Sequence, residues 1–536
     1  MKTLIVSLLA FSSVAFAAVT VCDVRDYGAS GNGKTKDTQA IQKAIEACAQ
    51  KGAGVVYFPP GSYLTGTINL RSNVTLHIEA GATLLASPDV EDYPLLPDPY
   101  QPQNLSRSAL IYGLALENVT ITGRGTIDGQ GILWWKRAHM PTQPVDIDFH
   151  GHHLANSPGQ GDYYFQGKPT KEEAEKVAKH GSPKSFLLVS CTNVLIEGLT
   201  VRNSPNWTVD LAFGEQVVLR GLTVNNAMES PTTDAMDLES CRNVHIENCT
   251  LGAGDDLVTI KSGREPAGLR LNRPSENITV TNCTLLQGHG GIVIGSDTSG
   301  GARNIAVSNC VLRGTDLGFW LKTQRGRGGV VDGFVASNIV MEDVYEPFRI
   351  TMYYDLATML GFTATRRPIP REGAQPVTEG TPVWRNLSFE NILARGATTA
   401  GFILGLPESP FSGITFSNVR VWAKQEGFYC RFAKDVAFHN AQINTGAGSA
   451  LVCRNVDDLE IDGFRTTEPH AEAPVIDLNS ITDVFLRNSW AAPGTGTFLN
   501  VSGDSTRNVV LNANDLRYAK QATSVAKEAA KEVRVQ

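Results

Sequence analysis

Short segments of alternating apolar and polar residues recur along most of this chain of 536 residues. Many begin with asparagine, as in Asn118 to Ile121 (NVTI) and Asn243 to Ile246 (NVHI). Alternation with a period of two is typical of a strand with one buried face. Neighbouring segments usually lie about 22 to 34 residues apart, without helices between them, which predicts an all-β parallel β-helix solenoid. A propeller fits less well, because a blade has a longer period and contains several strands.

Two segments have helical spacing instead. Between Thr38 and Gln50 the apolar residues recur at the spacing of one helix face, which predicts a short helix that caps the exposed strand edges of the first coil. The tail from Leu516 to Val533 is rich in Ala, Lys and Glu and predicts a helix at the end of the chain.

The repeats also suggest how the chain is divided. We expect a signal peptide over 1–17, a cap with the first coils over 18–105, a β-helix domain over 106–515 and the helical tail over 516–536. A long interruption at about 136–185 separates two strand repeats and contains one helical piece, Lys171 to Lys179. A loop of this length in a compact domain is usually functional or disordered.

The composition permits a large core. Apolar residues make up 42% of the chain and charged residues 19%, which argues against disorder. The formal net charge of -7 argues against a general nucleic-acid binder. We expect neither a nucleic-acid nor a membrane partner, and a monomer.

The first residues have the pattern of an export signal. Lys2 precedes the apolar run Leu4 to Phe11, and Ala15 to Ala17 (AFA) resembles a cleavage site. The apolar run is too short to span a bilayer. The pattern predicts cleavage near Ala17 and a mature protein that is secreted or periplasmic.

Nine cysteines follow that point, in a compartment that permits disulfides. Cys22 with Cys48, and Cys430 with Cys453, are the bridges we expect. Three further cysteines occupy the same position of the repeat, so stacked free thiols are the alternative: Cys249, Cys283 and Cys310.

Aligning successive coils on their apolar strands places ionisable residues above one another. Asp255 falls over His289, His289 over Asp316, and Asp234 over Asp256. Coils stack at strand spacing, about 4.8 Å. We therefore expect one cluster with Lys322 a few coils away, made of Asp234, Asp255, Asp256 and His289. Strict alternation would point Asp255 and Asp256 to opposite faces, so a turn or bulge is expected beside Gly252 and Gly254.

Carboxylates this close repel one another, so at least one should hold its proton above the usual pKa. A protonated acid beside an ionised carboxylate is what glycoside hydrolysis requires. A single aspartate of this kind would more often stabilise a turn.

Four segments carry a family resemblance: Thr232 to Asp234 (TTD), Gly254 to Asp256 (GDD), Gly288 to Gly290 (GHG) and Trp320 to Lys322 (WLK). They resemble the Asn-Thr-Asp, Gly-x-Asp-Asp, Gly-His-Gly and Arg-Ile-Lys motifs of glycoside hydrolase family 28, the polygalacturonases and related pectinases. The similarity runs from Asp26 to about Pro407.

The resemblance implies a right-handed parallel β-helix and an inverting mechanism. By position, Asp255 would be the general acid, and Asp234 with Asp256 would orient and deprotonate water. His289 would tune the protonation of the acid, and Lys322 would bind a galacturonate carboxylate.

Two residues depart from the motifs. Thr232 stands where the family has asparagine. We expect at most a modest loss of activity from this change, because the threonine hydroxyl can still form hydrogen bonds. Trp320 replaces the arginine of the fourth motif; it would offer a stacking face for a sugar or would be a buried ladder residue. Arg349 aligns with Trp320 in the next coil, and we hypothesise that it partly restores the positive charge.

Other charged groups carry weaker predictions. A basic set suits a polyanion, although each member could be an ordinary surface residue: Lys261, Arg264, Arg303, Arg325 and Arg327. In the interruption, a rim loop that closes one cleft end is favoured over a metal site made of Asp146, Asp148, His150, His152 and His153.

The sequence thus predicts a secreted glycoside hydrolase that cleaves α-1,4-galacturonosyl linkages of pectin with inversion and without a metal cofactor, with exo and endo action as alternatives. One alternative is a hydrolase of rhamnogalacturonan or another decorated pectin. Two others are a Ca²⁺-dependent β-helix lyase and a non-catalytic polysaccharide-binding solenoid.

Overall fold

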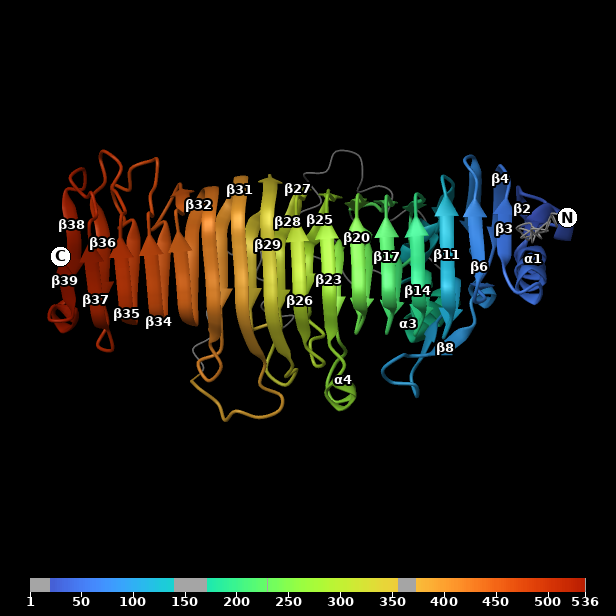
Figure 1. The fold of residues 1–536 in the computed structure, drawn as a ribbon, viewed down its shortest axis with the longest axis horizontal. Helices are drawn as coiled ribbons and strands as arrows, with labels where there is room; N and C mark the ends of the chain where they lie inside the picture. Colours follow the sequence, from blue (N-terminus) through green and yellow to red (C-terminus); the bar gives the residue numbers. More distant parts are fainter. Residues whose placement is uncertain (1–19, 139–170, 229, 355–372, 536) are drawn as a thin grey trace, which may run out of the picture.

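The computed structural model describes residues 20–138, 171–228, 230–354 and 373–535. In these residues the strands pair in parallel into one long sheet that winds into an elongated solenoid, with the two chain ends at opposite tips (Figure 1). One antiparallel pair, β8 (Leu95–Pro97) with β9 (Leu105–Arg107), stands apart from it among the described strands. The predicted all-β, right-handed parallel β-helix is confirmed.

Strands of successive coils form three ladders. The first ladder carries the candidate site and contains β5 (Ile68–Asn69), β10 (Ala109–Leu114), β13 (Lys184–Val189), β16 (Val209–Ala212), β19 (Met236–Glu239), β22 (Val258–Lys261), β25 (Gly288–Ile294), β28 (Thr315–Lys322), β30 (Glu346–Thr351), β36 (Thr497–Ser502) and β38 (Gln521–Val525). The second contains β1 (Val21–Asp23), β3 (Gly54–Phe58), β6 (Val74–Ile78), β11 (Glu117–Gly123), β14 (Thr192–Glu197), β17 (Glu215–Arg220), β20 (Arg242–Glu247), β23 (Ser275–Thr281), β26 (Ala302–Ser308), β37 (Arg507–Asn512) and β39 (Val533–Val535).

The third ladder contains β2 (Asn32–Lys36), β4 (Gly61–Thr65), β7 (Ala82–Ala86), β12 (Thr126–Asp128), β15 (Thr200–Arg202), β18 (Thr223–Asn225), β21 (Thr250–Gly252), β24 (Thr284–Leu285), β27 (Val311–Arg313) and β33 (Gln442–Thr445). Longer strands bend from one ladder into the next, namely β29 (Val330–Glu342), β31 (Val383–Leu404), β32 (Phe411–His439), β34 (Leu451–Asp462) and β35 (Ile476–Arg487).

The asparagines of the repeat are explained by the turns between ladders. Asn118 and Asn193 both adopt left-handed backbone conformations, which asparagine tolerates better than most residues. The side-chain amide of each donates to the asparagine one coil below, as Asn193 does to Asn118 at 2.7 Å. The repeated asparagine therefore serves both the turn and the stacking of coils.

The predicted cap is confirmed as α1 (Thr38–Gln50), whose buried face is Ile41, Ala44, Ile45 and Cys48. The helical piece of the interruption is confirmed as α3 (Lys171–His180). The other helices described are α2 (Gly131–Ala138) and α4 (Ala267–Leu271). Residues 139–170 of the interruption, with its histidine and aspartate candidates, lie outside the described residues.

The predicted C-terminal helix is wrong. The tail forms β38, a 3-10 turn at Lys527–Ala529 and β39. These strands pair with β36 and β37, so they satisfy the backbone groups of the last coil, which would otherwise be an open sheet edge. Strand pairing outweighs the helix preference of Ala, Lys and Glu, which is favourable but amounts to only tenths of a kcal/mol, roughly, per residue.

All nine cysteines are buried free thiols, so the predicted bridges Cys22–Cys48 and Cys430–Cys453 are not formed. Cys430 and Cys453 are register partners on β32 and β34. Cys283 raises the pKa of the Cys249 thiol by accepting a hydrogen bond from it, and burial raises it further, which fits the stacked-thiol alternative.

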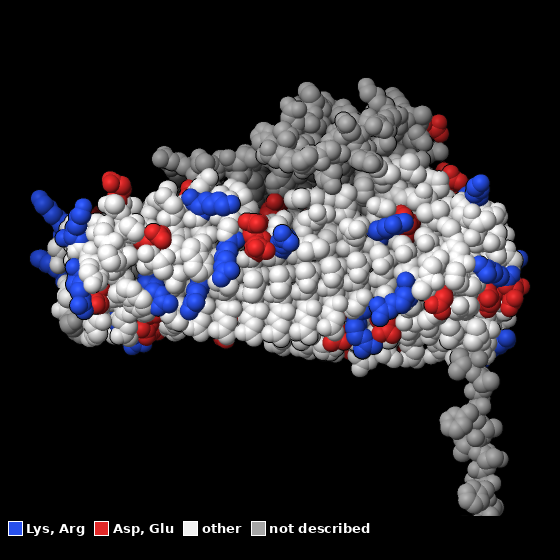
Figure 2. All heavy atoms as spheres, turned by 90° about the horizontal axis from the view of Figure 1, so that it is seen from above, with Lys and Arg blue, Asp and Glu red and all other residues white. Residues whose placement is uncertain are grey.

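The outer surface mixes both signs of charge. Seen from above, basic and acidic side chains lie next to one another in several places along the solenoid (Figure 2). Among the described residues, no helix is long and apolar enough to cross a membrane.

Candidate active site

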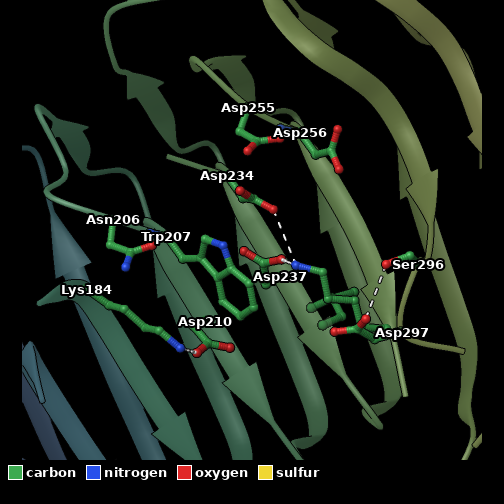
Figure 3. A network of polar contacts seen from close by, with 12 residues as sticks. Lys184, Asn206, Trp207, Asp210, Asp234, Asp237, Asp255, Asp256, Ser296 and Asp297 are labelled. Atoms are coloured by element: carbon green, nitrogen blue, oxygen red, sulfur yellow. Dashed lines mark hydrogen bonds and ion pairs between the residues drawn. The ribbon is translucent and has the colours of Figure 1, made fainter. Parts of the chain in front are cut away.

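Three carboxylates meet at the start of two neighbouring strands of the first ladder. Asp234 precedes β19, and Asp255 and Asp256 precede β22 (Figure 3). One oxygen from each lies within 4.8 Å of the others. The register confirms the predicted alignment, because Met236 pairs with Val258 and Val258 pairs with Ile292.

A bend lets both adjacent aspartates serve one site. Residues 253–257 leave the strand conformation between β21 and β22, so the alternation of sides is interrupted there, as expected. Gly254 is required in this bend, because a Cβ atom there would come within 2.0 Å of the Ser230 carbonyl oxygen.

The loop that carries Asp234 is tied to this bend. The Thr233 hydroxyl accepts a hydrogen bond from the Gly254 backbone N–H at 3.1 Å and lies 2.5 Å from the Ser230 hydroxyl. Thr233 is fully buried. The segment Thr232 to Asp234 therefore positions its carboxylate through a backbone contact with the segment that carries the other two.

Two of the three carboxylates hold a buried lysine. Lys322 lies 2.9 Å from Asp256, and Lys261 lies 3.3 Å from Asp234 and 2.5 Å from Asp237. Burial by itself lowers the pKa of Lys322, but Asp256 and other neighbouring anions raise it more, so it ends above its usual value. The pKa of Lys261 is raised in the same way by Asp237 and Asp234. These ammonium groups place two positive charges beside the carboxylates of Asp234 and Asp256.

Asp255 is in the opposite situation. Burial raises the pKa of its carboxyl well above the usual value, and the charges of Asp234 and Asp256 raise it further. The raised pKa favours a proton on Asp255, which lies beside two carboxylates that are paired with lysines. Such a division of roles distinguishes an acid from a base in one site.

His289 belongs to the same site through the next coil. Its backbone N–H donates to the Asp255 carbonyl oxygen at 2.9 Å, and its Nδ1 lies 2.8 Å from Asp316 Oδ2. The ring packs edge-on against Trp320, with centroids 4.5 Å apart. Asp316 was aligned with His289 in the sequence but was not assigned a role there.

The last glycine of Gly288 to Gly290 leaves room for a carboxylate. A Cβ atom on Gly290 would lie 2.6 Å from Asp256 Oδ1 and 3.3 Å from the Trp320 ring. Any side chain at Gly290 would therefore displace the Asp256 carboxylate, which gives the motif a steric reason.

Trp320 is 2% exposed, and its ring contacts His289 and the Lys322 ammonium, which lies 3.2 Å from the ring centroid. The burial fits the ladder interpretation of Trp320; sugar stacking stays a prediction. Arg349 pairs with Trp320 in the next strand, as aligned, but its guanidinium donates to Glu346 at 2.9 Å, and Glu346 is fully buried. Much of its charge is therefore compensated.

The remaining basic candidates do not all lie at this site, and each contacts a carboxylate. Arg264 and Arg327 contact Asp297, at 2.8 and 3.6 Å, next to the first ladder. Arg325 contacts Glu408 at 2.6 Å. Arg303 lies on β26 in the second ladder and pairs with Glu276, so it is not part of this site.

A second set of buried charges adjoins the cluster and was missed in the sequence. Lys184 contacts Asp210, and the Trp207 ring lies between Lys184 and Lys261, 4.4 and 3.6 Å from their ammonium nitrogens (Figure 3). The signal was present, because Asp210, Asp237 and Glu239 are polar residues at outward positions of predicted strands. The four motifs, however, point only to the residues beside these three.

The three clustered carboxylate oxygens could also act as ligands for a cation. Lys261 and Lys322 already supply two positive charges to Asp234 and Asp256. A divalent ion would have to approach those ammonium groups, so the donor set suits water better than a metal.

Comparison with known proteins agrees with these features. Residues 145–442 match the model of glycosyl hydrolases family 28, and residues 21–157 match that of rhamnogalacturonase A/epimerase, pectate lyase-like. A probable polygalacturonase of Vitis vinifera is 30% identical over 78% of each chain. An exo-poly-alpha-D-galacturonosidase of Dickeya chrysanthemi is 26% identical over 75% of this chain and 72% of that one.

Among solved structures, a hyperthermoactive exopolygalacturonase from Thermotoga maritima aligns with a TM-score of 0.65 and 30% identity, covering 79% of this chain and 92% of that one. The family match covers more than half of the chain and includes all four motif segments. This chain is therefore a glycoside hydrolase that belongs to family 28, the polygalacturonase family.

Proposed function

We propose that this enzyme hydrolyses α-1,4-galacturonosyl linkages of polygalacturonate with inversion of the anomeric carbon. The observation that carries the proposed hydrolysis is the division among the three carboxylates, whereas inversion is proposed from the resemblance to family 28. Asp234 and Asp256 each hold a lysine, whereas burial and its two neighbours raise the pKa of Asp255. One site thus offers a proton and a base at the same pH.

In the proposed reaction, Asp255 donates its proton to the glycosidic oxygen as the bond to the anomeric carbon breaks. Asp234 and Asp256 hold one water molecule; oxygens within 4.8 Å of each other can both bind it, because two hydrogen bonds of about 2.8 Å span that gap. The water attacks the anomeric carbon from the opposite face and passes its proton to that pair.

His289 and Asp316 support the acid in this proposal. Asp316 holds the imidazole through Nδ1 and so fixes its orientation beside the acid. Lys322 is proposed to hold the Asp256 carboxylate in place and to meet a galacturonate carboxylate when substrate arrives.

We further propose that the enzyme acts from chain ends. The support comes from relatives, since the Thermotoga maritima structure and the Dickeya chrysanthemi protein are both described as exo-acting. An endo-polygalacturonase of Pectobacterium carotovorum is 26% identical over 67% of this chain, so endo action is the outcome to be tested against.

A decorated pectin is the second candidate. It is favoured by Trp320 in place of an arginine, by the compensated charge of Arg349 and by the N-terminal match to rhamnogalacturonase A/epimerase. All three observations concern the substrate and leave the proposed acid and base unchanged.

Product analysis on polygalacturonate and rhamnogalacturonan, side by side, separates these proposals. Release of monomer from polygalacturonate, with β-galacturonate as the first anomer seen by NMR, is the expected result. An α first product would contradict inversion, a ladder of oligomers would contradict exo action, and activity on rhamnogalacturonan alone would favour the second candidate. Full activity in EDTA is expected, since no step uses a metal.

We also propose that the enzyme is exported as a monomer and works outside the cytoplasm. The support is the signal-like pattern of residues 1–17. The mass of the mature protein from the culture medium would test cleavage near Ala17.

A further inference from the structure

Beyond the catalytic cluster, the outward face of the first ladder continues toward the C-terminus. Trp320 pairs with Arg349, Arg349 with Phe402, and Phe402 with Tyr429. One row over, Lys322 leads in the same way to Arg431 and then to Arg454. Both rows alternate along β32 with Phe428 and Cys430, which are buried in the core, so the rows face away from it.

The far part of these rows has the chemistry of a binding surface. Phe402 and Tyr429 stack nearly in parallel, with centroids 5.5 Å apart and planes at 16°. Burial raises the pKa of the Tyr429 phenol, and the positive charge of the nearby Arg431 guanidinium opposes part of that rise. Arg431 lies about three strand spacings, or ~14 Å, from Lys322 along the solenoid.

Arg431 differs from most of the basic residues near the site. Arg454 in the same row contacts Asp477, whereas no carboxylate among the described residues lies within ion-pair distance of Arg431. Its guanidinium instead lies 4.4 Å from the centroid of the Phe432 ring. Arg431 and Tyr429 are both partly exposed, so the positive charge is open to a ligand.

In the opposite direction along the same ladder, Lys184 of β13 is already paired with Asp210, and the outward positions beyond Asp210 are apolar. Asp210 and Ala212 of β16 pair with Leu187 and Val189 of β13, and the next outward positions are Tyr112 and Leu114. Leu187, Val189, Tyr112 and Leu114 carry no charge that could bind an anionic chain. The two ends of the face are therefore chemically unequal.

We infer that Tyr429 and Arg431 form a distal subsite, which binds a uronate unit of an acidic polysaccharide whose chain runs from the catalytic cluster toward the C-terminal coils. The inference rests on the proposed function, since it takes the substrate to be a galacturonan. Arg431 would hold a uronate carboxylate in a charge-assisted contact, and the Phe402–Tyr429 pair would offer flat apolar rings beside the chain.

Kinetics on galacturonate oligomers of graded length test this subsite. In the wild type, kcat/KM should rise with length until the chain reaches Arg431. In Arg431→Gln, the ratio of kcat/KM for long oligomers to that for the dimer should fall about tenfold. Arg431→Lys, which keeps the charge, should retain most of the ratio. The matched control is Arg420→Gln, on the same strand but pairing in the third ladder, which should leave the ratio as it is.

A second variant guards against a folding defect. Tyr429→Leu keeps a side chain that can pack against Phe402 but removes the aromatic face and the phenol, and it should lower the same ratio. An unchanged ratio in both variants, or an equal fall in Arg420→Gln, would overturn the subsite. A wild type inactive on every galacturonan would instead overturn the proposed function, and the two failures are thus separable.

Discussion

The Nδ1 atom of His289 lies 2.8 Å from Oδ2 of Asp316, on strands of adjacent coils. Both residues are buried, His289 at 2% and Asp316 at 9% exposure. A buried carboxylate that holds one imidazole nitrogen selects the tautomer and stabilises the imidazolium. Asp316 is therefore a positioning residue for the histidine beside the proposed acid.

Asp316→Asn should lower kcat on oligogalacturonate by roughly tenfold or more, because the imidazole loses its negative partner. The pH dependence of kcat should shift as well, whereas KM should change little. Asp316→Glu keeps the carboxylate and should keep more of the pH profile. A uniform loss of rate with an unmoved profile in Asp316→Asn would argue for a purely structural role.

Asp255→Asn should abolish most of the activity and stabilise the fold at neutral pH. Loss of the general acid should cost on the order of 10² to 10⁴ in kcat. The Asp255 carboxyl has a pKa raised by burial and by Asp234 and Asp256. Its contribution to stability is complete below the pKa of the unfolded chain and is lost as the pH rises toward the raised value.

Urea unfolding at pH 4 and pH 7 checks this second effect. The stability gain of Asp255→Asn should be present at pH 7 and small at pH 4. A variant that is equally destabilised at both values would show that the carboxyl serves the fold, not the reaction.

Glu239 gives a pH prediction that does not depend on catalysis. Burial raises its pKa from 4.5 to about 8, and Asp210 adds to the effect. The folded protein thus favours the neutral acid, so stability from this residue is lost as the pH rises from about 4.5 to 8. Glu239→Gln should remove this loss, which amounts to at most about 5 kcal/mol.

Unfolding free energies of the wild type and Glu239→Gln, measured in steps from pH 5 to pH 9, provide the comparison. The difference in favour of the variant should grow up to about pH 8 and then level off. A constant difference over this range would mean that Glu239 is ionised throughout.

The sequence predicted the fold well because the repeat carries its own register. The alternation placed Asp255 over His289 and Trp320 over Arg349, and the strand pairs confirm both. The terminal helix failed for a physical reason: composition reports local preference, whereas the last coil needed partners for the edges of β36 and β37.

The site was predicted in position more than in detail. Register brought the three carboxylates together, but the pairing of Lys322 with Asp256 and of Arg349 with Glu346 depends on side-chain packing. Register places Asp316 over His289, but the contact between its carboxylate and the imidazole depends on side-chain packing, which the alignment does not give.

Thr232 provides the last prediction. Its φ of 51° is left-handed, a conformation that a β-branched side chain adopts only at a cost and that asparagine tolerates. The family motif has asparagine at this position. Thr232→Asn should therefore raise the free energy of unfolding by about 1 kcal/mol and leave kcat nearly unchanged.

The same substitution one residue further on is its control. Thr233 is fully buried, and its hydroxyl accepts from the Gly254 N–H, so Thr233→Asn should destabilise the fold and lower kcat together. Thermal unfolding and kcat of both variants complete the comparison. If Thr232→Asn were also destabilised, the threonine would be making a contact that outweighs its backbone strain, and its departure from the motif would be a stabilising one.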